Sequence, residues 1–93
     1  MDEIFELRVT FHGLVQGVFF RAAVKDVADA LNLKGFVKNQ ADGTVFAKVI
    51  GHSDKLKEFM KKIGQNPGSG RIDKIDYKMA KSTEKVETFQ INY

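Results

Sequence analysis

The sequence predicts an α+β fold in which two helices cover one face of an antiparallel sheet. Three observations support this fold class. Several segments alternate apolar and polar residues with a period of two, two other segments carry apolar residues at helical spacing, and turn-forming residues separate the segments. The chain has 93 residues, 43 % of them hydrophobic, which is enough for one core. We therefore expect residues 1–93 to form a single domain.

The first elements follow from these periods. A strand is predicted over residues 5–12, where apolar side chains at odd positions alternate with polar ones. A helix is predicted over residues 20–32, where apolar residues recur at spacings of three and four, and Gly35 is a candidate stop signal. The same criteria predict strands over residues 35–39 and 44–50 and a helix over residues 53–63. A loop is predicted over residues 64–70, followed by strands over residues 75–79 and 87–93.

The element order is therefore β-α-β-β-α-β with an additional C-terminal strand. Two split βαβ units on one antiparallel sheet form the ferredoxin-like sandwich. Each helix has one apolar stripe to bury, so both helices are expected on the same face of the sheet. The sequence does not assign a neighbour to the last strand.

Composition excludes several classes of protein. The chain has no cysteine, which excludes disulfides and thiolate metal sites, and its two histidines lack metal-ligand spacing. We expect no metal and no other cofactor. No apolar run approaches the roughly 20 residues that span a bilayer, and the acidic start lacks a signal-peptide core. We therefore expect a cytoplasmic protein without membrane contact, and a monomer, since no exposed apolar seam is evident. The net charge of +3 is too mild to indicate a partner.

The most informative segment lies between the first strand and the first helix. Amide N–H groups at a helix N-terminus, with the helix dipole behind them, form an anion site. An arginine in the first helical turn adds a permanently charged fork that matches phosphate oxygens. Glycines let the backbone approach a ligand closely. The segment consists of Gly13, Leu14, Val15, Gln16, Gly17, Val18, Phe19, Phe20 and Arg21.

Topology places a second residue near this segment. The first strand, first helix and second strand form a right-handed βαβ unit, so the two strands run in the same direction and end at the same edge of the sheet. The second strand ends near Asn39, which we therefore expect close to the loop despite the long sequence separation.

Two blocks of sequence resemble the acylphosphatase family. The first is Gly13-Leu-Val-Gln-Gly-Val-Phe-Phe-Arg21, and the second is Gly35-Phe-Val-Lys-Asn39-Gln-Ala-Asp-Gly43-Thr-Val45. They occur in the family's order and at its usual distance, and the resemblance covers essentially the whole chain. It implies hydrolysis of the carboxyl–phosphate bond of acyl phosphates, giving a carboxylate and inorganic phosphate without a metal. It also implies a small-molecule partner and no nucleic acid.

The resemblance assigns roles to single residues. Arg21 would bind the phosphoryl group together with the amides of residues 14–20, and Asn39 would orient the attacking water. The chain departs from the family's commonest form at Phe19 and Gln40, which affects the shape of the pocket more than the reaction. The chemistry is consistent, because a carboxylate is a good leaving group and the enzyme has mainly to hold charge and align a water.

Plainer readings of the same residues remain open. Arg21 can be a surface residue paired with an acid such as Glu3, and Asn39 can simply begin a turn. His12 is a weaker candidate base, because no acidic partner is evident from spacing. A catalytically inactive interaction or regulatory module with this fold is the main alternative. An RNA-recognition domain shares the element order, but Glu6, Arg8, Thr10 and His12 on the outward face of the first strand offer no stacking surface.

Overall fold

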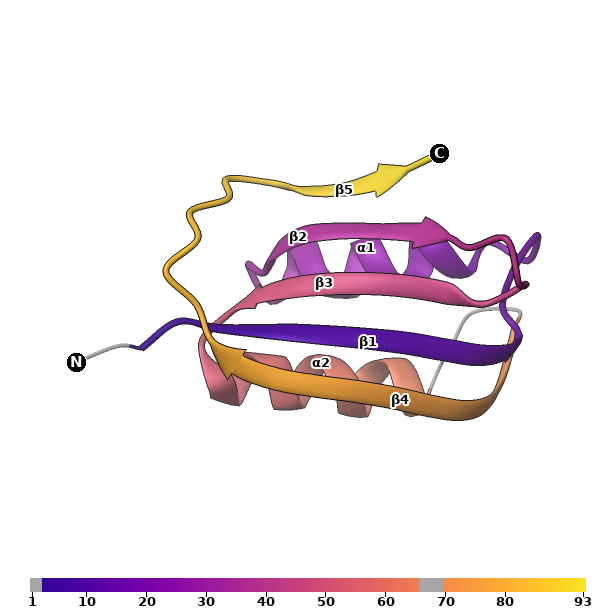
Figure 1. Ribbon diagram of the computed structural model, residues 1–93, viewed down its shortest axis with the longest axis horizontal. Helices are drawn as coiled ribbons and strands as arrows, with labels where there is room; N and C mark the ends of the chain where they lie inside the picture. Colours follow the sequence, from indigo (N-terminus) through magenta and orange to yellow (C-terminus); the bar gives the residue numbers. More distant parts are fainter. Residues whose placement is uncertain (1–2, 66–69) are drawn as a thin grey trace.

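The computed structural model describes residues 3–65 and 70–93. Figure 1 shows a sheet with both helices packed behind one face, which is the predicted ferredoxin-like arrangement. The predicted order of strands and helices is confirmed, including the additional C-terminal strand. The elements are β1 (Phe5–Leu14), α1 (Phe20–Ala30), β2 (Lys34–Asn39), β3 (Val45–Gly51), α2 (Ser53–Gln65), β4 (Arg71–Lys81) and β5 (Phe89–Asn92).

The five strands lie in the order β4-β1-β3-β2-β5. The first four pair antiparallel, as predicted, but β5 pairs parallel to β2, with Phe89 opposite Gly35. The sheet is therefore mixed rather than wholly antiparallel. The reason is visible in Figure 1, where the chain leaves β4 at one edge, crosses one end of the sheet and starts again at the other edge in the direction of β2.

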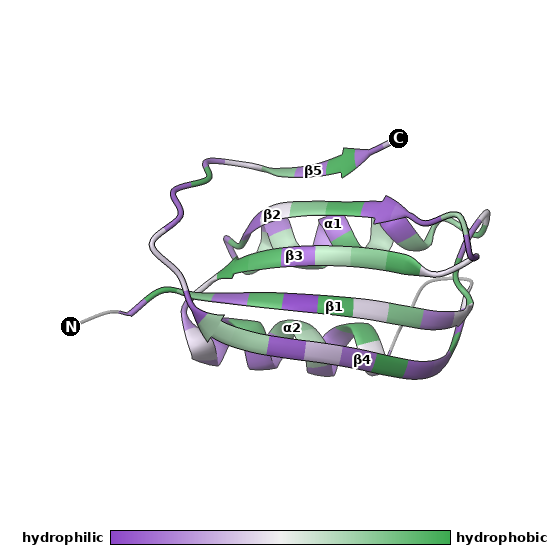
Figure 2. Ribbon diagram, in the orientation of Figure 1, coloured by the Kyte–Doolittle hydropathy of each residue, from purple (hydrophilic) through white to green (hydrophobic). Residues whose placement is uncertain are grey.

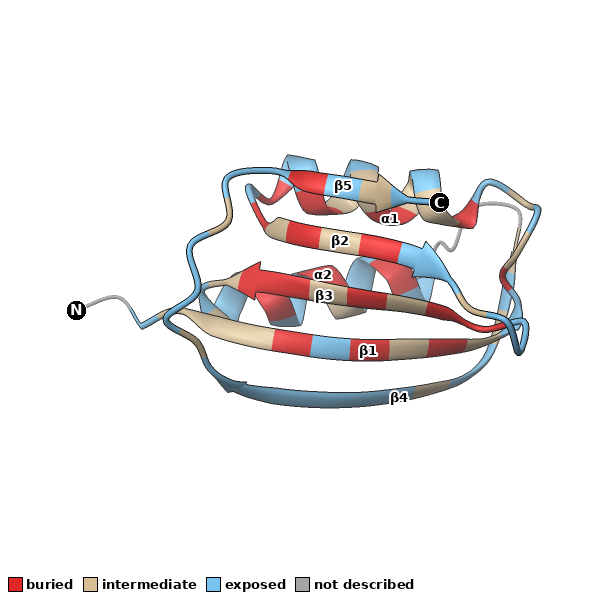
Figure 3. Ribbon diagram, turned by 45° about the horizontal axis from the view of Figure 1, so that its top comes forward, coloured by how far each residue is buried: buried red, intermediate tan, exposed pale blue. Residues whose placement is uncertain are grey.

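The core lies between the sheet and the helices. Figure 3 shows buried residues alternating with others along the central strands, whereas β4 at the sheet edge is mostly exposed. Figure 2 shows the same alternation as hydropathy. The rings of Phe11 and Phe20 meet edge to face with centroids 5.1 Å apart, which fixes the start of α1 against β1. The helices bury Phe20, Val24, Ala28, Leu56, Phe59 and Ile63.

Several element boundaries differ from the prediction: β1 continues to Leu14, α1 ends at Ala30, and β4 covers Arg71–Lys81 rather than residues 75–79. Asn32, not Gly35, follows the end of α1 in the left-handed conformation, with φ 57°. Gly35 lies inside β2 with φ 133°, and a Cβ atom there would collide with the carbonyl oxygen of Lys48. Its conformation allows close strand pairing instead. The loop predicted over residues 64–70 starts later than expected, because α2 continues to Gln65; residues 66–69 lie outside the described residues.

The helices themselves are short. No helix in the ranges 3–65 and 70–93 is long and apolar enough to cross a membrane.

Candidate active site

The loop between β1 and α1 is held by the core at both ends. Val15 and Phe20 are almost completely buried, whereas Gly17 and Phe19 between them face outwards. Val18 packs partly against the core. Burial of the flanking side chains leaves the backbone of the loop little freedom, so its amide groups are oriented before any ligand arrives.

The backbone of this loop alternates in the sign of φ. Gly17 and Phe19 have positive φ angles of 72° and 60°, and Val18 and Phe20 do not. Alternation of this kind turns successive N–H groups towards one side and forms a concave anion-binding nest. Phe19 is also the N-cap of α1, and its side chain makes no capping hydrogen bond. The N–H groups of the first helical turn lack intrahelical acceptors and remain available to an anion.

Arg21 extends from this first helical turn. Its Nη1 donates a hydrogen bond to the carbonyl oxygen of Asn92, 3.0 Å away, and its guanidinium lies 4.7 Å from the centre of the Tyr93 ring. No carboxylate within residues 3–65 and 70–93 lies within ion-pair distance of it, and Glu3 pairs with Lys81 instead. The positive charge of Arg21 is therefore oriented by the end of β5 and is not neutralised by an acid.

Asn39 is the last residue of β2, at the same end of the sheet as the loop. It is exposed, and its carboxamide has no hydrogen-bond partner among the described side chains and backbone. Asn39 and Arg21 line one cavity of about 340 Å³, as topology predicted. The other lining residues are Val15, Gly17, Phe19, Phe20, Ala22, Ile91 and Tyr93.

Gln16 connects the loop to the turn that follows Asn39. Its side-chain Nε2 donates to the carbonyl oxygens of Gln40 and Thr44, at 2.7 and 2.8 Å. Both hydrogens of the amide are thus used, and both acceptors belong to the β2–β3 turn. This bridge ties the loop that leads into Arg21 to the turn that follows Asn39.

The β2–β3 turn is stabilised by its own hydrogen bonds. Asp42 accepts from the hydroxyl of Thr44 at 2.6 Å and from its backbone N–H at 3.0 Å, and these bonds hold the pKa of the Asp42 carboxyl below its usual range. Gln40 donates to the Thr44 hydroxyl at 2.8 Å. Gln40 therefore braces the turn and is not among the residues that line the cavity.

The predicted site residues fall into two groups. Val15, Gly17, Phe19, Phe20, Arg21 and Asn39 line the cavity, whereas Leu14, Gln16 and Val18 do not. Leu14 ends β1 opposite Arg71. Sequence reasoning did not name three lining residues: Ala22, which follows Arg21 on α1, and Ile91 and Tyr93, which it missed because it could not place the last strand. The alternation of residues 89, 91 and 93 was the available signal for the face that they share.

The histidine considered as a base lies elsewhere. His12 Nε2 is 2.9 Å from Asp76 Oδ2 on β4, on the sheet face away from the helices, so it does have an acidic partner that sequence spacing did not reveal. It does not line the cavity. In the described parts of the chain, no group of three or more His, Asp or Glu side chains is arranged to hold a metal ion.

Comparison with known proteins identifies relatives over most of the chain. The sequence model of the family described as acylphosphatase matches residues 7–91. An acylphosphatase from Lactobacillus johnsonii is 40 % identical over 88 residues, covering 94 % of each chain, and one from Enterococcus faecalis is 38 % identical over 87 residues, covering 92 % of this chain and 96 % of its own.

Solved structures agree. The crystal structure of acylphosphatase from Bacillus subtilis superposes with a TM-score of 0.91 at 31 % identity, covering 96 % of this chain and 99 % of its own. The match of fold, length and sequence extends over both blocks that form the cavity. The chain belongs to the acylphosphatase family.

Proposed function

We propose that this protein hydrolyses acyl phosphates to a carboxylate and inorganic phosphate at the cavity between the β1–α1 loop and the end of β2. The observation that carries this proposal is the pairing, in one cavity, of an arginine that has no carboxylate partner among the described residues with an asparagine whose carboxamide is unengaged. Membership of the acylphosphatase family supports the same reaction.

The reaction requires little covalent chemistry from the protein. Water attacks phosphorus, the bond from phosphorus to the bridging oxygen breaks, and the electron pair of that bond leaves with the carboxylate. A carboxylate is a weak base, so no acid has to protonate the leaving group. Catalysis then consists of positioning the reactants and stabilising the charge on the phosphoryl oxygens.

Arg21 and the loop amides carry out the charge stabilisation in this proposal. The guanidinium presents parallel N–H donors to two phosphoryl oxygens. The amides of residues 14–20 and the N-terminus of α1 face the third oxygen. Because Asn92 and Tyr93 already orient the guanidinium, binding does not have to immobilise a flexible side chain.

Asn39 positions the nucleophile. Its side-chain oxygen accepts a hydrogen bond from water, but a neutral amide is too weak a base to take the proton. The proton of the attacking water therefore passes to a phosphoryl oxygen, and the product is protonated phosphate. In this proposal water placement and anion capture are separate tasks, performed by Asn39 and Arg21.

The proposal also covers the domain number, metal dependence, cellular location and oligomeric state of the enzyme. We propose a single-domain, metal-independent, cytoplasmic enzyme that acts as a monomer on small-molecule acyl phosphates. The alternative is a catalytically inactive interaction or regulatory module with the same fold.

Steady-state hydrolysis of benzoyl phosphate in the presence of EDTA tests the function. We expect turnover that EDTA does not reduce and that inorganic phosphate inhibits competitively. Loss of turnover in EDTA, restored by a divalent metal, would overturn metal independence. Absence of hydrolysis with and without metals would favour the inactive module.

A further inference from the structure

The cavity is larger than a phosphoryl group requires, and its remainder is lined by apolar and aromatic side chains. Its volume of about 340 Å³ falls in the range of roughly 300–1,000 Å³ that is typical of sites for small molecules. Arg21 and the loop amides define the end that attracts an anion. The rest of the lining includes Val15, Ile91, Phe19 and Tyr93.

Phe19 is unusual in two respects. Its side chain is 83 % exposed, the largest exposure of any phenylalanine in the described residues, although burial of such a ring is normally favourable. Its backbone adopts the left-handed conformation, which is rare for a bulky residue. The conformation follows from the nest, and Phe19 is among the residues that line the cavity.

Tyr93 provides a second aromatic ring at the same cavity. The Arg21 guanidinium lies over this ring, and the ring is otherwise exposed. Phe19 approaches the cavity from the start of α1 and Tyr93 from the end of β5. Two exposed aromatic residues from different elements thus line the cavity that binds the anion in the proposed function.

We propose that Phe19 and Tyr93 contact the acyl group of the substrate, so that the enzyme prefers acyl phosphates with an aromatic or bulky apolar acyl group over acetyl phosphate. This inference rests on the proposed function and specifies its substrate class. Rings stack on aromatic side chains in offset or edge-to-face geometry, and a methyl group cannot gain this contact. The phosphoryl end is bound identically in all substrates, so the acyl end alone distinguishes them.

The ratio of kcat/KM for benzoyl phosphate to kcat/KM for acetyl phosphate measures this preference. The two compounds differ in intrinsic reactivity, but that difference cancels when a variant is compared with the wild type. We expect Phe19→Ala and Tyr93→Leu each to lower the ratio by about fivefold, the size of one aromatic contact. Tyr93→Phe retains the ring and should retain the ratio.

Tyr77→Ala is the matched control, because Tyr77 is an exposed aromatic residue on β4 outside the cavity. It should change neither kcat/KM value. A ratio that stays at the wild-type value in both Phe19→Ala and Tyr93→Leu would overturn the inference. Tyr93 would then act only by orienting Arg21, because loss of that role reduces both substrates equally.

Binding of two phosphonates separates this inference from the proposed function. Benzylphosphonate and methylphosphonate carry similar charge and no scissile anhydride, and NMR titration gives their Kd values without turnover. With about fivefold from each ring, we expect the wild type to bind benzylphosphonate roughly 25-fold more tightly than methylphosphonate, and Phe19→Ala to reduce this difference to about fivefold. This preference without any hydrolysis would support the inference and overturn the proposed function. Equal Kd values in the wild type would overturn the inference whether or not hydrolysis occurs.

Discussion

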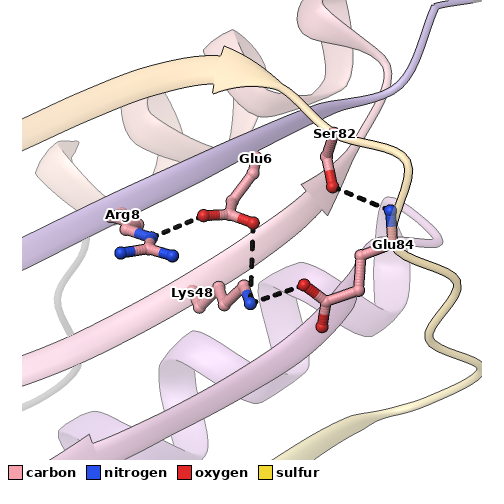
Figure 4. A network of polar contacts seen from close by, with 5 residues as sticks. All are labelled: Glu6, Arg8, Lys48, Ser82 and Glu84. Carbon is pink, nitrogen blue, oxygen red and sulfur yellow. Dashed lines mark hydrogen bonds and ion pairs between the residues drawn. The ribbon is translucent and has the colours of Figure 1, made fainter.

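Two polar regions of this protein use similar residues for different purposes. One is the cavity at the ends of β1 and β2, and the other is a charged network on the sheet face away from the helices. In that network Lys48 bridges Glu84 at 2.6 Å and Glu6 at 3.5 Å, and Arg8 also pairs with Glu6 (Figure 4). Every cation in the network has an acidic partner, whereas Arg21 in the cavity has only a carbonyl oxygen and an aromatic ring.

This difference indicates what each region does. Paired charges on a surface contribute modestly to stability and have little left to offer a ligand. The network ties residues 82–88, which link β4 to β5, to the middle of the sheet through Glu84. An arginine that is oriented but not neutralised is suited to bind an external anion. The network therefore stabilises the fold that carries the cavity, whereas Arg21 is left free of acidic partners, among the residues that the structure describes, for the anion binding that we propose.

Substitution of one arginine in each region should give the largest difference in activity between the two regions. Arg21→Gln should lower kcat/KM for an acyl phosphate by about 10²–10³ and abolish inhibition by phosphate, since it removes a preorganised donor to the reacting group. Arg8→Gln, the control, should leave kcat/KM within about twofold, because Arg8 pairs with Glu6 on the other face. Steady-state kinetics of both variants measure this contrast. Similar losses of kcat/KM in the two variants would contradict the distinction between the cavity and the charged network.

Asn39→Ala is expected to have the next largest effect. It should lower kcat by about 10², the cost of a misplaced nucleophile, while inhibition by phosphate stays within about twofold of the wild type. Steady-state measurements of kcat and of the inhibition constant for phosphate check these two expectations. A near-normal kcat would show that Asn39 does not position the attacking water.

Gln16→Leu should have an intermediate effect. The carbonyl oxygens of Gln40 and Thr44 would lose their side-chain donor, at a cost of about 1–3 kcal/mol in the free energy of unfolding. Because the turn positions Asn39, kcat should fall by roughly tenfold with little change in phosphate inhibition. Gln90→Leu is the control, since Gln90 is exposed and its side-chain amide, within the described residues, hydrogen-bonds to Thr88 alone. A stability loss with unchanged kcat would make Gln16 structural only.

Lys48→Met should have the smallest effect, and it should appear in stability alone. We expect a loss of about 0.5–1 kcal/mol in the free energy of unfolding at pH 7 and unchanged turnover. Burial alone would raise the pKa of Glu6, but Arg8 and Lys48 outweigh it and hold that pKa below its usual 4.5. The stabilisation is therefore present above pH 4.5 and is lost as pH falls through the lower folded value.

Denaturant unfolding of wild type and Lys48→Met at several pH values measures this effect. The difference between them should shrink below about pH 4.5. A difference that grows as the pH falls would contradict the assignment of Glu6 as the group that titrates.

The sequence predicted what depends on local pattern and on chain direction. Periodicity identified the strands and helices, and the right-handed crossover brought Asn39 to the cavity of Arg21 although they lie in different elements. These features follow from short-range preferences and from a rule that applies to all βαβ units.

The features that sequence reasoning missed depend on pairing between distant segments. The parallel pairing of β5 with β2 decides that Tyr93 reaches Arg21, and nothing local in residues 87–93 encodes the neighbour. The partner of His12 is Asp76 on β4 for the same reason. The Gln16 bridge needs both the loop and the turn in place before its acceptors meet.

The open face of the sheet shows the same limit of local pattern. The outward residues of β1 offer no stacking surface. Phe36 on β2 and Phe46 on β3, however, pack together across these two paired strands, with ring centroids 6.0 Å apart. An argument from the first strand alone could not reveal a pair that forms across strands.

Titration of the ¹⁵N-labelled protein with inorganic phosphate, followed by amide NMR shifts, is the most direct test of the claim that Arg21 and the β1–α1 loop bind the phosphoryl group. We predict saturable shifts that are largest for the amides of residues 14–20 and for Arg21 Nε, with residues around Lys48 unaffected. Shifts centred on the charged network, or no saturable shift in the loop, would contradict the account.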